Sequence, residues 1–176
     1  MSPAGGARLA YIGLGANLGD ARHTLEAAID DLARLPHSRV LARSSFYASA
    51  PVDADGPDYL NAVVALDTSL DPAALLAMCL SIEAAHGRER PYAHAPRTLD
   101  LDLLLAGDAV IDTPTLTLPH PRMHQRAFVL APLVEIAPDA VIPGRGRARD
   151  CLETVGAQRC MRVVEKTLPS PKENPR

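Results

Sequence analysis

The stretch PRTLDLDLLL, residues 96–105, sets two aspartates into an apolar run that has the alternation of a β-strand. Side chains of a strand alternate between its two faces, so Asp100 and Asp102 are expected on one face and the intervening leucines on the other. Two strand positions span roughly 6.5–7 Å, and carboxylates converging over that span can share two divalent ions held ~3.5–4 Å apart. Hard oxygen ligands of this kind suit magnesium. The stretch therefore predicts a strand with one packed face and one working face.

Several arginines accompany this strand in the sequence. An isolated Asp-x-Asp pair is more often a solvated strand face than a metal site. Here, guanidiniums both precede and follow the pair, and their forked geometry suits phosphate oxygens. Magnesium ligands among guanidiniums indicate a phosphate site. The arginines of this region are Arg88, Arg90, Arg97, Arg122 and Arg126.

The chain before this stretch alternates strand and helix signals. Residues 9–14 form a short apolar run, and the turn after them ends at Asp20, which is expected to cap a helix. Apolar residues then recur at helical spacing as far as Pro36, which closes the pattern. Residues 40–50 and 59–68 are β-prone, and turn-forming residues join them in a loop too long for a tight hairpin.

A second helix is predicted over residues 72–86, because Asp71 and Pro72 form a helix start and Gly87 forms a stop. After the aspartate strand we expect a hairpin that turns at residues 106–108. The resulting order is β-α-β-β-α-β. It predicts an α+β, ferredoxin-like fold, in which helices pack on one face of an antiparallel sheet, followed by C-terminal additions.

Length and composition limit the class of protein. The 176 residues suit one domain, expected over residues 9–160, between a flexible N-terminus at 1–8 and a disordered tail at 161–176. Three cysteines without C-x-x-C spacing argue against a disulfide framework or a structural zinc site and favour the cytoplasm. We find no signal profile and no apolar run long enough to span a membrane. A net charge of −3 argues against nucleic acid as a partner.

Glycines at 13, 15 and 19 suggest a phosphate-binding loop at first sight. Their spacing is G-x-G-x-x-x-G, however, and no Lys-Ser or Lys-Thr pair follows, so both the Rossmann and the Walker motif are rejected. The glycines are expected to serve a tight exit from the first strand, where backbone torsions turn positive or a neighbour comes close.

A second group of residues suggests a site for a flat ring. Tyr59 and Asn61 lie two apart on a predicted strand and share a face, which offers a ring for stacking and an amide for hydrogen bonding. Phe128 can supply a second ring, although core packing is the default for a phenylalanine. A structural role and a phosphate contact stay equally open for His120, and Glu83 is by default an ion-pair partner.

Six segments occur in an order and at a spacing that is more specific than any single motif. They are YIGLGANLGD (11–20), SSFYASAP (44–51), PDYLNAVVALDT (57–68), IEAAHGR (82–88), PRTLDLDLLL (96–105) and LPHPRMHQRAFVLAPLVEIAP (118–138). Together they cover most of residues 9–143. In this they closely resemble the 6-hydroxymethyl-7,8-dihydropterin pyrophosphokinases, the folate-pathway family that moves a diphosphate from ATP to a pterin alcohol.

The resemblance implies a role for each residue that matches a family motif. Asp100 and Asp102 would be the ligands of two Mg²⁺ ions, and with Arg88 and Arg97 they would form the catalytic group. The implied ATP contacts are Glu83, Arg88, Arg90, Arg97, Leu103 through its backbone, Thr117, His120 and Arg126. The implied pterin contacts are Ser49, Ala50, Val52, Tyr59, Asn61 and Phe128.

The implied reaction is in-line attack of the pterin hydroxymethyl oxygen on the β-phosphorus of ATP, with AMP as the leaving group and no covalent enzyme intermediate. The expected enzyme is a monomer that binds two small molecules and neither nucleic acid nor membrane. Two alternatives stay open. One is another magnesium-dependent phosphate- or nucleotidyl-transfer enzyme, and the other is a non-catalytic ferredoxin-like binding module.

Overall fold

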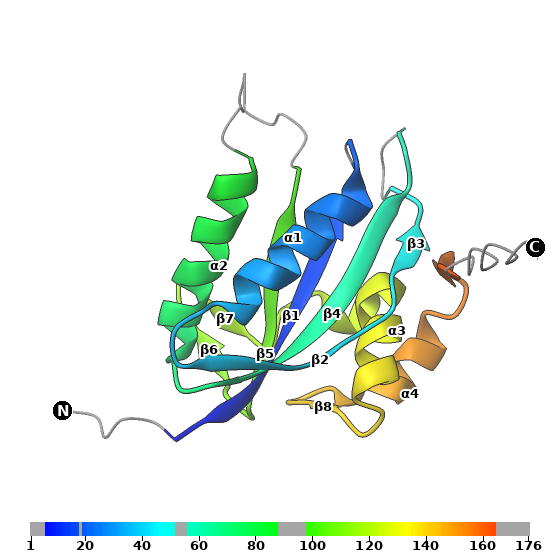
Figure 1. Cartoon of the computed structure of the whole chain (residues 1–176). Coiled ribbons are helices and arrows are strands. Elements are labelled where there is room, and N and C mark those ends of the chain that lie inside the picture. Colours follow the sequence, from blue (N-terminus) through cyan, green and yellow to red (C-terminus); the bar gives the residue numbers. More distant parts are fainter. Residues whose placement is uncertain (1–5, 18, 52–55, 88–97, 165–176) are drawn as a thin grey trace, which may run out of the picture.

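The chain folds around one antiparallel sheet, shown in Figure 1 as a computed structural model that describes residues 6–17, 19–51, 56–87 and 98–164. The elements are β1 (Arg8–Ala16), α1 (Ala21–Ala33), β2 (Ser38–Arg43), β3 (Tyr47–Ser49), β4 (Tyr59–Thr68), α2 (Pro72–His86), β5 (Asp100–Ala106), β6 (Ile111–Asp112), β7 (Thr117–Leu118), the 3-10 helix η1 (Met123–Gln125), α3 (Ala127–Ile136), β8 (Val141–Ile142), β9 (Gly146–Arg147), α4 (Ala148–Thr154) and β10 (Cys160–Arg162).

Six strands form the central sheet in the order β10-β3-β4-β1-β5, and β2 also pairs with β4. The β-prone run expected over residues 40–50 is divided into β2 and β3. Between them the Ser44 amide donates to the Val63 carbonyl on β4 at 2.9 Å, and the Ser44 hydroxyl accepts a hydrogen bond of 2.9 Å from the amide of Val63 in place of a carbonyl. Because β2 and β3 both pair antiparallel with β4, they act as one strand of the expected order. The ferredoxin-like βαββαβ arrangement is confirmed.

The two predicted helices begin at their predicted caps. The Asp20 carboxylate accepts a hydrogen bond of 3.1 Å from the amide of His23, and Asp71 accepts one of 2.8 Å from Ala74. Such caps satisfy amides that have no partner within the helix. The apolar stripes of α1 and α2 then pack on one face of β1, β4 and β5 and form the larger part of the core.

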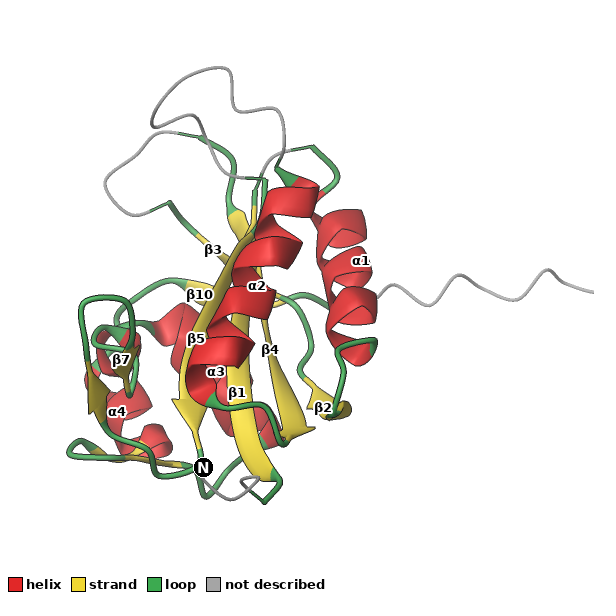
Figure 2. Cartoon of the chain, turned by 90° about the vertical axis from the view of Figure 1, so that its left-hand side faces the viewer, coloured by secondary structure: helices red, strands yellow, loops and turns green. Residues whose placement is uncertain are grey.

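The opposite face of the sheet is covered as well, by α3 and α4, which lie across the sheet from α1 and α2 (Figure 2). Leu130 and Leu133 of α3 are fully buried, and they share this second core with Val63 and Leu104 of the sheet. The expectation of helices on one face was therefore incomplete. The C-terminal additions make a second layer, which encloses the face that carries Asp100 and Asp102.

The expected hairpin after β5 is wrong in its pairing. The chain does turn at Gly107, where φ is 55°, but β6 pairs with β7 and not with β5. The free edge of β5 is occupied by other groups, because His120 donates its amide to the Leu104 carbonyl at 3.0 Å. Glu83 accepts the amide of Leu101 on the same strand. Strand β6 is thereby left to pair with β7.

Strands lie at both margins of the expected domain. β1 begins at Arg8 rather than at Leu9. Residues 161–164, expected in a disordered tail, belong to the folded part, because Cys160–Arg162 pair with β3 as the edge strand β10. Cys79, Cys151 and Cys160 are free thiols in the structure.

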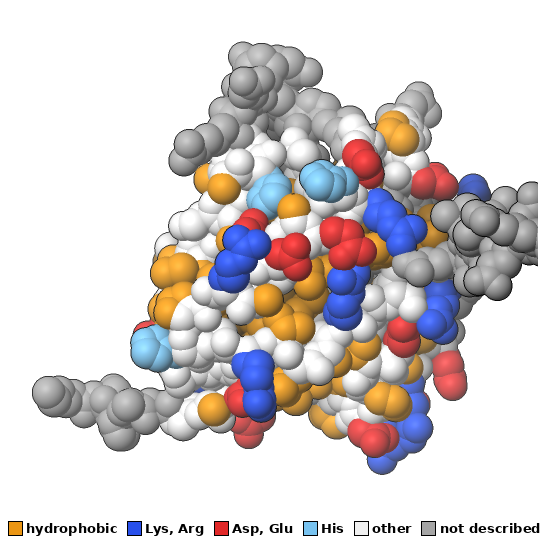
Figure 3. All heavy atoms as spheres, in the orientation of Figure 1, with side chains coloured by type: hydrophobic (Ala, Val, Ile, Leu, Met, Phe, Trp, Pro, Cys, Tyr) orange, Lys and Arg blue, Asp and Glu red, His pale blue; other side chains and the backbone are white. Residues whose placement is uncertain are grey.

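The face that carries α1 and α2 shows acidic and basic side chains interspersed around an apolar area (Figure 3). Within the described ranges, no helix combines the length and the apolar character that crossing a bilayer requires.

Candidate functional site

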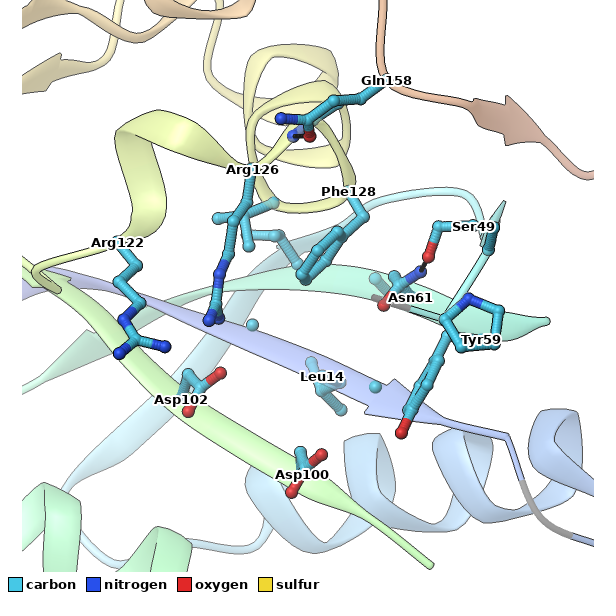
Figure 4. A pocket seen from close by; sticks show the side chains of 18 of the residues that line it. Leu14, Ser49, Tyr59, Asn61, Asp100, Asp102, Arg122, Arg126, Phe128 and Gln158 are labelled. Carbon is cyan, nitrogen blue, oxygen red and sulfur yellow. Dashed lines mark hydrogen bonds between the residues drawn. The ribbon is translucent and has the colours of Figure 1, made fainter. Parts of the chain in front are cut away.

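A cavity of about 800 Å³ lies on the face of the sheet opposite α1 and α2 (Figure 4). Its floor comes from β1, β4 and β5. One wall is formed by η1 and the start of α3, and the other walls by the end of β3 and by residues 158 and 159. Elements far apart in the sequence thus enclose a single space.

Glycines make the floor of this cavity flat. In the sheet register Gly13 lies opposite Asp102 on one side and Val63 on the other, and Gly15 lies between Asp100 and Asn61. A Cβ atom on Gly15 would lie 3.3 Å from the Asn61 Oδ1 atom. The expected positive torsion occurs at Gly19, whose φ is 61°, and the expected close neighbour occurs at Gly15. Gly13 and Gly15 also leave room above the strand.

The two aspartates project into the cavity from the edge strand β5. Figure 4 shows both carboxylates on the same side of the strand, with the guanidiniums of Arg122 and Arg126 reaching toward Asp102. A second hollow of about 420 Å³ adjoins them and is lined by Asp100, Asp102, His120, Arg122 and Arg126 among others. Both carboxylates therefore lie on one face of β5, as the alternation predicted, with guanidiniums beside them.

The oxygen ligands at this face suit an open magnesium site, in which the protein supplies only some of the ligands. Within the described part of the chain, no three His, Cys, Asp or Glu side chains gather as a closed metal site. Mg²⁺ is commonly bound by one or two carboxylates together with waters and substrate phosphates. Asp100 and Asp102 provide such a pair, and the remaining positions would belong to a phosphate ligand and to water.

Glu83 supports the aspartate strand from α2. Its carboxylate accepts a hydrogen bond of 2.7 Å from the amide of Leu101, the residue between the two aspartates. At the unpaired edge of a sheet such an amide needs a partner. Glu83 therefore fixes the backbone from which the carboxylates project.

His120 is held as a hydrogen-bond donor toward the second hollow. Its Nδ1 atom accepts a hydrogen bond of 3.2 Å from the amide of Arg122, which leaves Nε2 as the donor of the neutral ring. Burial lowers the pKa of His120 below its ordinary value; Asp102 opposes this effect, and Arg126 and Arg122 add to it. A neutral ring that donates through Nε2 is suited to a phosphate oxygen.

The other end of the cavity carries the two rings and the amide. Figure 4 shows Asn61 between Tyr59 and Phe128. Asn61 is 4% exposed, and its Nδ2 group donates to the Ser49 hydroxyl at 2.8 Å and to the Tyr47 carbonyl at 3.2 Å. Because both amide hydrogens are used, Oδ1 is the atom that Asn61 can offer to a ligand. Ser49 and Ala50 line the same end.

Other expected site residues lie away from the cavity or outside the described ranges. Leu103 is 4% exposed, and its side chain belongs to the core under α1 and α2, so only its backbone can face a ligand. Thr117 lies on β7 and lines neither hollow. Four expected residues, Arg88, Arg90, Arg97 and Val52, lie outside the described residues.

The structure adds residues that the sequence did not single out for a site. Gly13 and Gly15 form the floor, and Gln125 and Gln158 line the walls. Arg122, one of the arginines that the sequence already grouped with the aspartates, lines the same cavity. The i, i+2 spacing of the two glycines within a strand pattern was a usable signal, because such residues share a face. For Gln158, the sequence offers no comparable signal.

Comparisons with known proteins point to one family. The sequence model of the family described as 7,8-dihydro-6-hydroxymethylpterin-pyrophosphokinase (HPPK) matches residues 11–138. A 2-amino-4-hydroxy-6-hydroxymethyldihydropteridine pyrophosphokinase from Methylorubrum extorquens is 50% identical over 136 residues, which cover 77% of this chain and 86% of that protein. The protein of the same name from Pseudomonas aeruginosa is 47% identical over 134 residues, covering 76% and 83%.

A solved structure shows the same fold at low sequence identity. The Plasmodium falciparum HPPK-DHPS wild type with SDX-DHP matches with a TM-score of 0.70 and 13% identity. The match covers 87% of this chain and 45% of that longer chain. At this identity the likeness concerns the fold alone.

Proposed function

This chain belongs to the 7,8-dihydro-6-hydroxymethylpterin-pyrophosphokinase family, and we propose on that premise that its cavity holds ATP and a reduced pterin side by side. The enzyme transfers the β,γ-diphosphate of ATP to the hydroxymethyl oxygen of 6-hydroxymethyl-7,8-dihydropterin. The products are AMP and the pterin diphosphate, in a step of folate synthesis. The observation that carries the proposal is one cavity with a carboxylate pair at one end and two rings about an amide at the other.

The phosphate end is assigned to Asp100, Asp102, His120 and Arg126. Two Mg²⁺ ions bound by the aspartates would offset the negative charge of the triphosphate. Arg126 and the Nε2 group of His120 then donate to phosphate oxygens. The expected roles of Arg88 and Arg97 as catalytic guanidiniums, and of Glu83, Arg90, Leu103 and Thr117 as ATP contacts, rest on the family resemblance.

The pterin end is assigned to Tyr59, Asn61 and Phe128, with Ser49, Ala50 and Val52 around them. A pterin ring inserted between the two aromatic side chains gains stacking and apolar burial. The Asn61 oxygen can accept a hydrogen bond from an N–H group on the edge of the pterin. The fixed Nδ2 contacts of Asn61 keep that oxygen in place before the ligand arrives.

Catalysis then depends on positioning and on charge. The two ends of the cavity hold the attacking oxygen and the β-phosphorus in a fixed relation, which replaces an improbable encounter in water. Donors aimed at the phosphate oxygens stabilise charge as the bond to AMP breaks. We assign no general base, because the attacking alcohol can lose its proton late in a loose transition state.

The two other functions considered for the sequence have less support. A different phosphate-transfer enzyme would need the aspartates but not the ring pair. An RNA-binding module would be expected to be basic, whereas this chain carries a net charge of −3. The proposal also includes that the enzyme is a monomer and that it acts in the cytoplasm. Both parts rest on the sequence alone.

The proposed assignment is tested by pterin binding in the presence of Mg²⁺ and a non-hydrolysable ATP analogue. We expect Tyr59→Ala and Asn61→Ala each to weaken binding about ten-fold or more, because each removes a contact to the ring. Leu41→Ala, at a residue 49% exposed on β2, is the control and should bind as the wild type does. Equal affinity in all four proteins would reject this placement of the pterin.

A further inference from the structure

Gln158 holds the backbone at the start of α3 with both ends of its amide. Its Oε1 atom accepts a hydrogen bond of 2.9 Å from the amide of Ala127. Its Nε2 group donates one of 2.8 Å to the carbonyl of Gln125. Figure 4 shows Gln158 beside this segment at the wall of the cavity. One side chain thus fixes the peptide groups on both sides of Arg126.

The segment that Gln158 holds carries a contact to each substrate. Ala127 lies between Arg126, assigned to ATP, and Phe128, assigned to the pterin. The Arg126 guanidinium lies 5.5 Å from the centroid of the Phe128 ring, so the two side chains form one stacked pair. A shift of the backbone at Ala127 would displace both members of the pair.

The start of α3 lacks a cap of its own. The first amides of a helix have no partner within the helix and are usually satisfied by the side chain of the N-cap residue. Here the N-cap is Arg126, which makes no capping hydrogen bond through its side chain. Gln158, from a distant part of the chain, supplies an acceptor for the first of these amides, that of Ala127.

Gln158 is itself fixed on both sides. Its backbone amide donates to the Val155 carbonyl at 3.0 Å, in the turn that follows α4. Two residues later the chain enters β10, where Cys160 pairs with Ser49 of the cavity wall. Gln158, the turn before it and β10 lie beyond residue 138, where the match to the family model ends.

We infer that Gln158 is a positioning residue for the Arg126–Phe128 pair, and that the C-terminal segment of this chain thereby sets the affinity for the pterin. The inference rests on the proposed function for its ligand. Gln158 acts through Ala127 and Gln125. It orders the pair before substrate arrives, which lowers the entropic cost of binding.

The test compares Gln158→Ala and Gln158→Glu with the wild type. We expect Gln158→Ala to raise the KM for the pterin about five- to ten-fold, with kcat changed less than about two-fold, because only ordering of the wall is lost. Gln158→Glu keeps the acceptor for Ala127 and should recover part of the affinity. Met161→Ala, at a residue 61% exposed on β10, is the matched control and should behave as the wild type does.

Amide hydrogen exchange at Ala127 provides a readout that needs no substrate. It should be faster in Gln158→Ala and unchanged in Met161→Ala. Unchanged exchange, or an unchanged KM for the pterin in an active Gln158→Ala enzyme, would overturn the inference. Equal losses in Gln158→Ala and Gln158→Glu, accompanied by a large fall in melting temperature, would also overturn it, since they indicate a general structural role. A wild type that shows the Gln158-dependent protection at Ala127 but no pterin binding would instead refute the proposed function.

Discussion

Two backbone positions without side chains decide how the substrates can approach the sheet. Gly13 and Gly15 face the cavity from β1, between the aspartates on β5 and Asn61 on β4. Any larger residue there would fill space that a ligand needs. The chemistry of the site therefore depends on missing atoms as well as on charged ones.

Replacing Gly15 by alanine tests this reading. The added Cβ would lie 3.3 Å from the Asn61 oxygen, the atom proposed to meet the pterin. We expect the KM for the pterin to rise about ten-fold, since a displaced hydrogen bond is worth roughly 1 kcal/mol or more. Gly13→Ala is the matched comparison, because the atoms nearest to its Cβ would be those of the Leu104 side chain, at 3.4 Å, and not the Asn61 oxygen. Steady-state kinetics that show a larger effect at Gly13 than at Gly15 would contradict the reading.

The carboxylates are tested by isosteric amides. Asp100→Asn and Asp102→Asn keep the size of each side chain but remove the charge that binds magnesium. We expect kcat to fall by about 100- to 1,000-fold or more in each, with little change in thermal unfolding because both side chains face the cavity. Asp112→Asn, on the exposed end of β6, serves as the control. Near-normal turnover in either site variant would refute the metal assignment.

At the scale of elements, one carboxylate joins α3 to β3. Glu135 on α3 accepts hydrogen bonds from the Ser45 amide at 2.9 Å, from the Ser45 hydroxyl at 2.8 Å and from the Tyr47 hydroxyl at 2.6 Å. Burial raises the pKa of Glu135, but the hydrogen bonds from Tyr47 and Ser45, together with Arg162, outweigh it and lower the pKa below its ordinary value. The two elements that carry Phe128 and Ser49 are thus linked.

This link predicts a pH-dependent stability. A carboxyl whose pKa is lower in the folded state stabilises the fold above its unfolded pKa, near 4.5 for glutamate, and loses that contribution as the pH falls through the folded value. We expect Glu135→Gln to cost about 1–3 kcal/mol at neutral pH. The difference from the wild type should shrink in acid. Urea unfolding of both proteins at neutral pH and at acid pH checks this. A stability difference between Glu135→Gln and the wild type that does not depend on pH would contradict it.

The sequence predicted those elements whose local signals agree with their packing. The caps at Asp20 and Asp71 and the apolar stripe of α1 predicted the helices correctly. The residues that start a helix and those that bury its face lie within one short stretch of sequence, so a local pattern records both. The pairing of β6 and the strand β10 could not be found in this way. Their partners lie on distant segments, and the pairing depends on which edge of the sheet is still open.

At the scale of the whole molecule, the two faces of the sheet differ in what covers them. The face under α1 and α2 is a continuous apolar core. The other face is divided between a second core under α3 and α4 and the open cavity. The family motifs in the sequence indicated the aspartates, the rings and Asn61 because these residues have recognisable types and spacings. The contribution of Gln158 depends on how the C-terminal segment returns to the sheet, which no local pattern records.

An open metal site predicts that ATP and magnesium stabilise the fold only together. A ligand present at about 100 times its Kd adds about 2.7 kcal/mol, which for a chain of this size raises the melting temperature by roughly 5–10 °C. We expect this shift with ATP and Mg²⁺, and little shift with ATP and a chelator or in Asp102→Asn. A full shift in the presence of chelator would argue that the aspartates hold no metal.

The central claim is the coupling of ATP cleavage to a pterin in one cavity. The most direct measurement is AMP formation from ATP and Mg²⁺, with and without 6-hydroxymethyl-7,8-dihydropterin, followed by chromatography of the pterin. We predict that AMP forms only with the pterin and in equal amount to a diphosphorylated pterin. AMP formation that does not depend on the pterin would contradict the account. So would a pterin that stays unmodified while AMP forms.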